Sequence, residues 1–169
     1  TPASIGGTLS VCEGATTTLF DATLGGAWSS SSPTNGSVDA VSGVVAGLTA
    51  GTTTISYTVT GCGTLTADVT VNATPAAITG NVPVCIGNSI ALNETTTGGA
   101  WSSSNTNASV DGSGNVSGLV VGTATISYTV GSCSATAPVT VTGTPAAISA
   151  PSFICLGNTT TLYDATPGG

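Results

Sequence analysis

The chain contains no Lys, Arg, His or Met, and its seven acidic residues give it a formal charge of -7. Without His or Lys there is no ordinary general base near neutral pH, no Ser-His or Cys-His nucleophile pair and no imidazole ligand for a metal. Without Lys or Arg nothing neutralises phosphate groups, so nucleic acid and anionic membrane surfaces are poor partners. Glycoside hydrolysis by carboxylates alone needs two acids facing across a cleft, and no pair of acids repeats with such a spacing. The composition therefore predicts a protein that is not an enzyme.

Only 4% of the residues are charged, yet 40% are apolar. Disordered chains combine low hydrophobicity with high net charge, and this chain lacks the first of those properties. Its longest apolar runs span a few residues, which is too short for a transmembrane helix. We therefore expect a folded chain without membrane insertion.

Three segments of the chain begin alike, with TPASIGGTLSVCEG at 1–14, TPAAITGNVPVCIG at 74–87 and TPAAISAPSFICLG at 144–157. Self-similarity at a fixed period indicates a repeat architecture. The predicted organisation is two complete repeats, at 1–73 and 74–143, followed by the start of a third and incomplete repeat at 144–169. We expect the chain to be a segment of a longer array.

Within a repeat the apolar residues alternate with Thr and Ser. In TISYTV (54–59), for example, Ile55, Tyr57 and Val59 alternate with polar residues, as in a strand with one buried and one wet face. About seven short strands in roughly 70 residues, without helical periodicity, predict an all-β fold with one small β-sandwich per repeat. Pro138 lacks a backbone N–H and predicts a strand edge or a bulge at that position.

Five cysteines occur, at Cys12, Cys62, Cys85, Cys133 and Cys155. Because each complete repeat contains two of them, we predict the disulfides Cys12–Cys62 and Cys85–Cys133, with the partner of Cys155 beyond the segment or in a neighbouring chain. Metal binding is the weaker interpretation, because Cys pairs at CxxC spacing and histidines are both missing. Closing a loop of roughly 50 residues contributes on the order of 4 kcal/mol. Such bridges indicate an oxidising compartment.

The only two tryptophans lie in the same motif, GGAWSSS, at Trp28 and Trp101. We interpret both as core residues of their repeats, together with Tyr57 and Tyr128 of the TISYTV strands. The alternative is a tryptophan that stacks on a ligand.

Calcium is the one ion for which the sequence offers a ligand pattern. Asp111, Ser113 and Asn115 in DGSGN supply oxygen atoms at alternate residues. The first repeat lacks this pattern, which favours an ordinary Asn/Gly turn. No other cofactor is expected.

Covalently attached glycans are a further expectation from the sequence. Asn-x-Ser/Thr sequons occur at Asn35, Asn72, Asn93, Asn107, Asn115 and Asn158. O-linked sugar on the Thr and Ser rows fits an uncharged secreted chain better. The sequence assigns no residue to either modification.

The stretch WSSSNTNASVDGSGNVSGLVVGTATISYTV at 101–130 resembles the core of the bacterial immunoglobulin-like group 2 (BIG2) repeat. The openings of the form TPA…VC.G are similar to the repeats of very long secreted proteins of the Bacteroidota. The resemblance implies immunoglobulin-like sandwiches in tandem, used as a stalk, an adhesin or a surface filament. Many members of that family lack cysteine, so the disulfides are a departure from it.

These observations predict a structural segment of an extracellular filament, stalk or sheath at the bacterial cell surface. Low charge removes repulsion between chains and favours self-association. A neighbouring chain that adds strands to the third repeat is a second route to assembly. The alternative function is an adhesin stalk, or a module that binds carbohydrate or a host protein.

Overall fold

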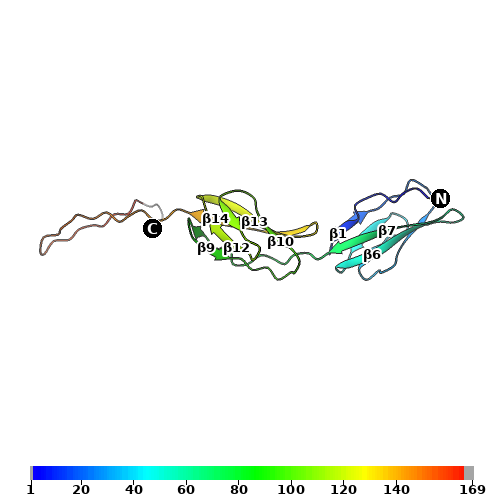
Figure 1. Cartoon of the computed structure of the whole chain (residues 1–169), viewed down its shortest axis with the longest axis horizontal. Helices are drawn as coiled ribbons and strands as arrows, with labels where there is room; N and C mark the ends of the chain where they lie inside the picture. The colour runs from blue at the N-terminus through cyan, green and yellow to red at the C-terminus, as the bar shows by residue number, and fades with distance from the viewer. Residues whose placement is uncertain (1, 166–169) are drawn as a thin grey trace.

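The computed structural model describes residues 2–165, which form two β-sandwiches end to end and then an extended segment (Figure 1). Residue 1 and residues 166–169, the end of the predicted third repeat, lie outside the described residues. The described part of the chain contains strands but no helix long and apolar enough to cross a membrane. The prediction of an all-β fold is confirmed.

The first sandwich packs a four-stranded sheet, in the order β1-β7-β6-β3, against a three-stranded sheet, in the order β2-β5-β4. Its strands are β1 (Ser10–Cys12), β2 (Thr16–Thr18), β3 (Ala27–Ser30), β4 (Gly36–Val38), β5 (Val44–Gly47), β6 (Gly51–Val59) and β7 (Gly63–Asn72). β1 pairs with the end of β7 in parallel, and the other pairs are antiparallel.

The second sandwich repeats this arrangement, with a four-stranded sheet β10-β13-β14-β8 and a three-stranded sheet β11-β12-β9. Its strands are β8 (Val84–Cys85), β9 (Ser89–Ala91), β10 (Ala100–Ser103), β11 (Ala108–Val110), β12 (Asn115–Gly118), β13 (Gly122–Val130) and β14 (Cys133–Thr142). Here too the first strand, β8, runs parallel to the end of the last, β14.

Each sandwich has its own hydrophobic core between its two sheets. The alternation along β6 places Ile55 and Tyr57 in the first core, and Ile126 and Tyr128 take the same places in the second. Both isoleucines are completely buried. The polar residues that alternate with the buried ones along each strand face outward and are partly or fully exposed. Burial of one face of the long hairpin therefore holds each sandwich together.

In the first sandwich the GGAW motif closes the core around Tyr57. Trp28 lies opposite Tyr57 on the neighbouring strand, with ring centroids 4.5 Å apart and planes tilted by 43°. The Tyr57 hydroxyl accepts a hydrogen bond from the Gly26 N–H at 3.0 Å and donates one to the Thr23 carbonyl at 2.6 Å. A Cβ at Gly26 would overlap the tyrosine ring, so the motif needs glycine there.

The second sandwich repeats these contacts with Trp101 and Tyr128, whose ring centroids lie 4.9 Å apart. The Tyr128 hydroxyl accepts from the Gly99 N–H at 2.9 Å and donates to the Thr96 carbonyl at 2.7 Å. Trp28 and both tyrosines are buried, whereas Trp101 is half-buried and packs against its core. All four aromatic residues therefore lie in or against the cores, as interpreted from the sequence.

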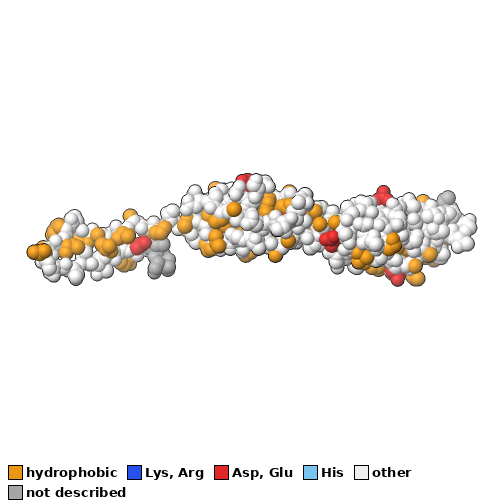
Figure 2. All heavy atoms as spheres, turned by 90° about the horizontal axis from the view of Figure 1, so that it is seen from below, with side chains coloured by type: hydrophobic (Ala, Val, Ile, Leu, Met, Phe, Trp, Pro, Cys, Tyr) orange, Lys and Arg blue, Asp and Glu red, His pale blue; other side chains and the backbone are white. Residues whose placement is uncertain are grey.

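Residues 144–165 form an extended ribbon beyond the second sandwich, held by a bridge between Ser149 and Tyr163 (Figure 1). Its apolar side chains are exposed along its length (Figure 2). Leu162 is 58% exposed, whereas the residue at the same place in the first repeat, Leu19, is 1% exposed. Within the described residues, the ribbon lacks the strands that cover such positions in the two sandwiches.

The substitution Tyr57→Phe is expected to lower the free energy of unfolding by about 1–3 kcal/mol, because it leaves the Gly26 N–H and the Thr23 carbonyl without their partner. Urea denaturation followed by tryptophan fluorescence measures the change. Thr66→Ser, on the exposed face of β7, is the control and is expected to stay within about 0.5 kcal/mol of the parent. Equal stability of Tyr57→Phe and the control would contradict the role assigned to the hydroxyl.

Candidate functional site at the junction of the two sandwiches

A disulfide joins the two sandwiches. It links Cys12 to Cys133, which are 121 residues apart in the sequence and have Cα atoms 5.8 Å apart. Cys62, Cys85 and Cys155 are free thiols. The predicted pairings Cys12–Cys62 and Cys85–Cys133 are therefore wrong, and so is the prediction of one disulfide within each repeat.

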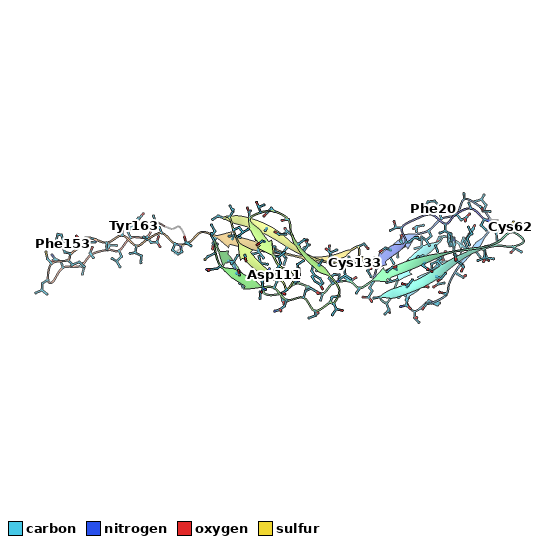
Figure 3. The ribbon with its side chains drawn as sticks, viewed as in Figure 1. Phe20, Cys62, Asp111, Cys133, Phe153 and Tyr163 are labelled. Carbon is cyan, nitrogen blue, oxygen red and sulfur yellow. A yellow bond between two sulfur atoms is a disulfide. The ribbon has the colours of Figure 1, made fainter. Side chains whose placement is uncertain are left out.

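The topology of a sandwich explains why its two cysteines do not pair with each other. Cys12 ends β1 and lies beside Asn72, at the end of β7. Cys62 lies in the turn that precedes β7, at the opposite end of the sandwich (Figure 3). The ten residues of β7 extend over about 30 Å, whereas a disulfide needs Cα atoms within about 7 Å.

The β13–β14 hairpin of the second sandwich reaches the first instead, and its turn carries Cys133 to the junction (Figure 3). Val130 pairs with Cys133, so the turn consists of two residues, Gly131 and Ser132. Gly131 has a φ of +58° and lies against the side chain of Asn72. A side chain at Gly131 would be strained and would also overlap Asn72.

Hydrogen bonds on the first sandwich continue across the junction. Asn72 Nδ2 donates to Ser10 Oγ at 2.7 Å, and Ser10 Oγ lies 3.3 Å from Ser132 Oγ on the second sandwich. Just past the end of β7, Thr74 Oγ1 donates to the Glu13 carbonyl at 2.9 Å. These bonds hold the linker and the turn against the end of the first sandwich.

Sequence reasoning missed these polar junction residues. Short polar side chains also fill the exposed faces of both sandwiches, so Ser10, Asn72 and Ser132 carry no distinguishing signal. Thr74 opens the repeated TPA motif, which marks the repeat boundary but not the contact that its hydroxyl makes.

A hollow of about 370 Å³ lies in the outer half of the first sandwich. Its lining includes Phe20, Asp21, Leu24, Trp28 and Val41. Phe20 is 64% exposed and Leu24 is 89% exposed, while one carboxylate oxygen of Asp21 is buried without a hydrogen-bond partner. The hollow thus combines apolar walls with one acidic group.

The calcium candidates lie in the turn between β11 and β12. Asp111 Oδ1 accepts the N–H groups of Ser113 and Asn115 at 2.8 and 2.9 Å, and Oδ2 accepts Asn115 Nδ2 at 2.8 Å. The carboxylate therefore closes its own turn. Among residues 2–165 no three His, Cys, Asp or Glu side chains cluster as a metal site would require. Calcium binding stays a prediction.

Cys12→Ser and Cys133→Ser both remove the junction disulfide. We expect the two variants to lower the free energy of unfolding of the second sandwich by the same amount. When the second sandwich unfolds on a folded first one, the bond closes the chain from Asn72 to Cys133 into a loop. The chain-entropy model gives about 4 kcal/mol for a loop of that size. Urea denaturation of the oxidised proteins measures the change.

Matched cysteine variants provide the control for that measurement. Cys62→Ser and Cys85→Ser are expected to keep the parent stability, and the double variant of Cys12 and Cys133 to lose no more than either single one. Equal losses in Cys12→Ser and Cys62→Ser would instead indicate pairing within the repeat.

The hydrogen bond from the Asn115 side chain, helped by the Asn115 and Ser113 backbone N–H groups, lowers the pKa of Asp111 below its usual value. A carboxyl whose pKa is lower in the folded state adds stability above its unfolded pKa, and this stability is lost as the pH falls through the folded pKa. In a carboxyl NMR titration, Asn115→Ala is expected to raise the pKa of Asp111. The pKa of Asp39, lowered mainly by the Ser42 backbone N–H, is expected to stay unchanged. An unchanged pKa of Asp111 in the variant would contradict this account of the turn.

No protein-family model matches the sequence, and no curated protein matches it either. Among solved structures, the chain is similar to the C-terminal 282-residue fragment of intimin, solved in complex with the intimin-binding domain of the translocated intimin receptor. The TM-score is 0.57 at 18% identity, over 83% of this chain and 64% of that chain. The chain thus spans less than two thirds of the intimin structure that it matches.

Two further likenesses have lower scores. The surface layer protein SbsC, domains 1-6, matches with a TM-score of 0.33 and 24% identity, over 79% of this chain and 24% of that chain. A SusE-like surface-located polysaccharide-binding protein from Bacteroides thetaiotaomicron matches with a TM-score of 0.35 and 15% identity, over 85% of this chain and 34% of that chain. Neither carries an argument about this chain. The likeness to intimin confirms the predicted immunoglobulin-like β-sandwich fold, and the finer resemblance to BIG2 and Bacteroidota repeats stays a prediction.

Proposed function

We propose that the chain is a non-enzymatic structural segment of an extracellular bacterial filament, stalk or sheath, in which immunoglobulin-like modules are coupled into a stiff rod. The observation that carries this proposal is the disulfide between the two sandwiches. A bond within one module stabilises that module, whereas a bond between modules restrains how they move relative to each other.

Two covalent connections cross the junction side by side. One is the chain itself, which leaves β7 at Asn72, and the other is the Cys12–Cys133 bond. Domains joined by a single linker move relative to each other by default unless their interface is large and hydrophobic. A second connection beside the linker removes most of that freedom without such an interface. The geometry thus supports a part that transmits force or holds a distance.

The composition supports an exposed location for such a rod. Disulfides persist in oxidising compartments such as the cell exterior. The chain contains no Lys or Arg, so proteases that cleave after basic residues find no site in it. Its acidic side chains are few and scattered over the surface (Figure 2), which leaves little electrostatic repulsion between rods. Self-association at the bacterial cell surface is part of the proposal.

The second candidate function is an adhesin stalk or a module that binds carbohydrate. The observation that favours it is the hollow around Phe20 and Leu24 on the first sandwich. The second sandwich has Asn93 and Thr97 at these places, so the hollow is not a general feature of the repeat. Exposed apolar walls of this kind suit a small ligand that has an apolar face.

Electron microscopy of the oxidised chain, together with small-angle X-ray scattering, tests the structural proposal. We expect straight rods of one length that align with one another as the concentration rises, and bent rods of variable shape for Cys133→Ser. Cys155→Ser is the matched control and is expected to behave as the parent. Bent and dispersed rods in the oxidised parent would contradict the structural function. Retention on immobilised polysaccharide that is lost in Leu24→Ser would favour the adhesin.

A further inference from the structure

The aromatic ring of Phe20 is exposed at the hollow on the first sandwich (Figure 3). A Cβ at Gly6 would come within 2.6 Å of the Cε2 and Cζ atoms of this ring, so the ring rests against the bare backbone of Gly6. The backbones of the two residues pair through hydrogen bonds of 2.8 and 3.0 Å, which fix the base of the side chain. Phe20 is nevertheless 64% exposed. Its ring therefore offers a supported apolar surface to solvent.

Two aliphatic side chains and a hydroxyl border the same hollow. Leu24 and Val41 both line it, and each is 89% exposed. Exposed apolar side chains that gather in one place mark an interaction site, whereas scattered ones are normal. Ser42 also lines the hollow, and its Oγ donates to Asp39 Oδ1 at 2.7 Å. A hydroxyl that donates in this way can still accept a hydrogen bond from a ligand.

The second sandwich has no such surface at the corresponding place. Asn93 and Thr97 replace the two apolar residues, and Thr79 stands where the first repeat has Gly6. The backbone pairing is kept, because Thr79 and Asn93 form the same isolated bridge. A β-branched side chain at this position would take the space that the Phe20 ring occupies in the first sandwich. The ring and its glycine support therefore differ together between the two repeats.

The turn that carries Val41 is also particular to the first sandwich. The Asp39 N–H donates to the carbonyl of Val44, whereas the Asp111 N–H donates to the carbonyl of Asn115. The first turn is thus one residue longer. Because the two sandwiches have the same strands in the same order, the fold does not require these differences.

A preceding module, docked as the first sandwich is docked before the second, would leave the hollow open. Asn93 and Thr97 are exposed although the first sandwich precedes them. The contacts across that junction involve the β13–β14 turn at Cys133 and the linker. The same arrangement before the first sandwich would leave Phe20 and Leu24 accessible. The hollow therefore does not depend on whether another module precedes it.

The charges and rings of the hollow favour a neutral ligand. The chain contains no Lys, Arg or His, and Asp21 lines the hollow. A phosphate, sulfate or carboxylate would therefore meet an acid and no opposite charge. An aromatic cage for a cation uses several open ring faces. Trp28 and Tyr57 are buried instead and pack on each other, with ring centroids 4.5 Å apart.

We propose that this hollow binds a neutral pyranose unit of a glycan, with one face of the sugar on the Phe20 ring. A pyranose has a face of C–H groups that lies flat on an aromatic ring, and hydroxyls around its edge. Leu24 and Val41 border the sugar, and Ser42 Oγ accepts from one of its hydroxyls. The volume of about 370 Å³ falls in the range of small-molecule sites, about 300–1,000 Å³.

This inference rests on the second candidate function, the binding module, and gives that module a ligand class. It is independent of the stiffness of the rod. The structural function is tested by the shape of the particles, whereas the present proposal is tested by sugar binding at named residues.

NMR titration of the isotope-labelled, oxidised chain tests the proposal. The probes are the methyl glycosides of glucose, galactose, mannose and N-acetylglucosamine, each added to about 100 mM so that millimolar dissociation constants are measured. We expect at least one of them to shift the signals of Phe20, Leu24 and Ser42. The signals of Asn93 and Thr97 in the second sandwich are expected to stay in place, which makes that sandwich an internal control.

Three variants separate the ring from the fold. Phe20→Asn installs the residue of the second repeat, and Gly6→Ala keeps the ring but displaces it. The new methyl group of Gly6→Ala meets the outer end of the exposed ring, so the ring moves while the sandwich stays folded. Both variants are expected to weaken sugar binding about tenfold and to keep the parent melting temperature. Leu48→Thr removes an exposed leucine outside the hollow and is expected to bind as the parent does.

The absence of shifts at the hollow with all of these glycosides would overturn the proposal, and so would equal binding by the parent and Phe20→Asn. Shifts caused only by tetramethylammonium or by isobutanol would overturn it in favour of a cation or of an apolar side chain of a protein partner. Retention on immobilised polysaccharide without shifts at the hollow would also overturn it, but would keep the adhesin candidate with its site elsewhere.

Discussion

The Cys12–Cys133 disulfide is the constraint on which the arrangement of the two sandwiches depends. It exists because the long β13–β14 hairpin spans its module and presents its turn beyond the end. The first strand of the preceding module finishes at that same place, beside the last strand. Each of the two described sandwiches has a cysteine that ends its first strand at one end and a cysteine at its long hairpin turn at the other. Short polar side chains, of the kind that also cover the exposed faces, contact the β13–β14 turn at the junction, where Gly131 packs against Asn72. The bond thus connects the end of one module to a turn of the next, beside the linker.

Much of the fold could be predicted because it follows from local rules. The alternation around Ile55 and Ile126 gave the buried faces of the long strands, and the repeated GGAW motif marked the tryptophan that packs on the tyrosine of the neighbouring strand. Pro138 also behaves as its missing N–H requires. β14 lies between β13 and β8 in the sheet, but β8 pairs only with Val141 and Thr142, so β14 is an edge at Pro138.

The disulfide pairing could not be predicted, because sequence order says which repeat contains a cysteine but not which end of the sandwich holds it. Cys12 and Cys62 belong to one repeat and lie a full strand length apart, whereas Cys12 and Cys133 meet across the junction. The position of Asn72 beside Cys12 comes from the parallel pairing of β1 with β7, a contact between the two extremes of a repeat. The hollow at Phe20 and Leu24 likewise depends on loops that approach each other only in the folded sandwich.

Disulfide mapping of the oxidised chain tests the central claim most directly. Trypsin is of no use without Lys or Arg, so the unreduced protein is cleaved at acidic and aromatic residues and analysed by mass spectrometry. The account predicts a pair of peptides that contain Cys12 and Cys133, separated by reduction, with Cys62 and Cys85 recovered as free thiols in the monomer. A peptide pair that joins Cys12 to Cys62 would contradict the account. It would mean that the linker is the only covalent connection between the two sandwiches.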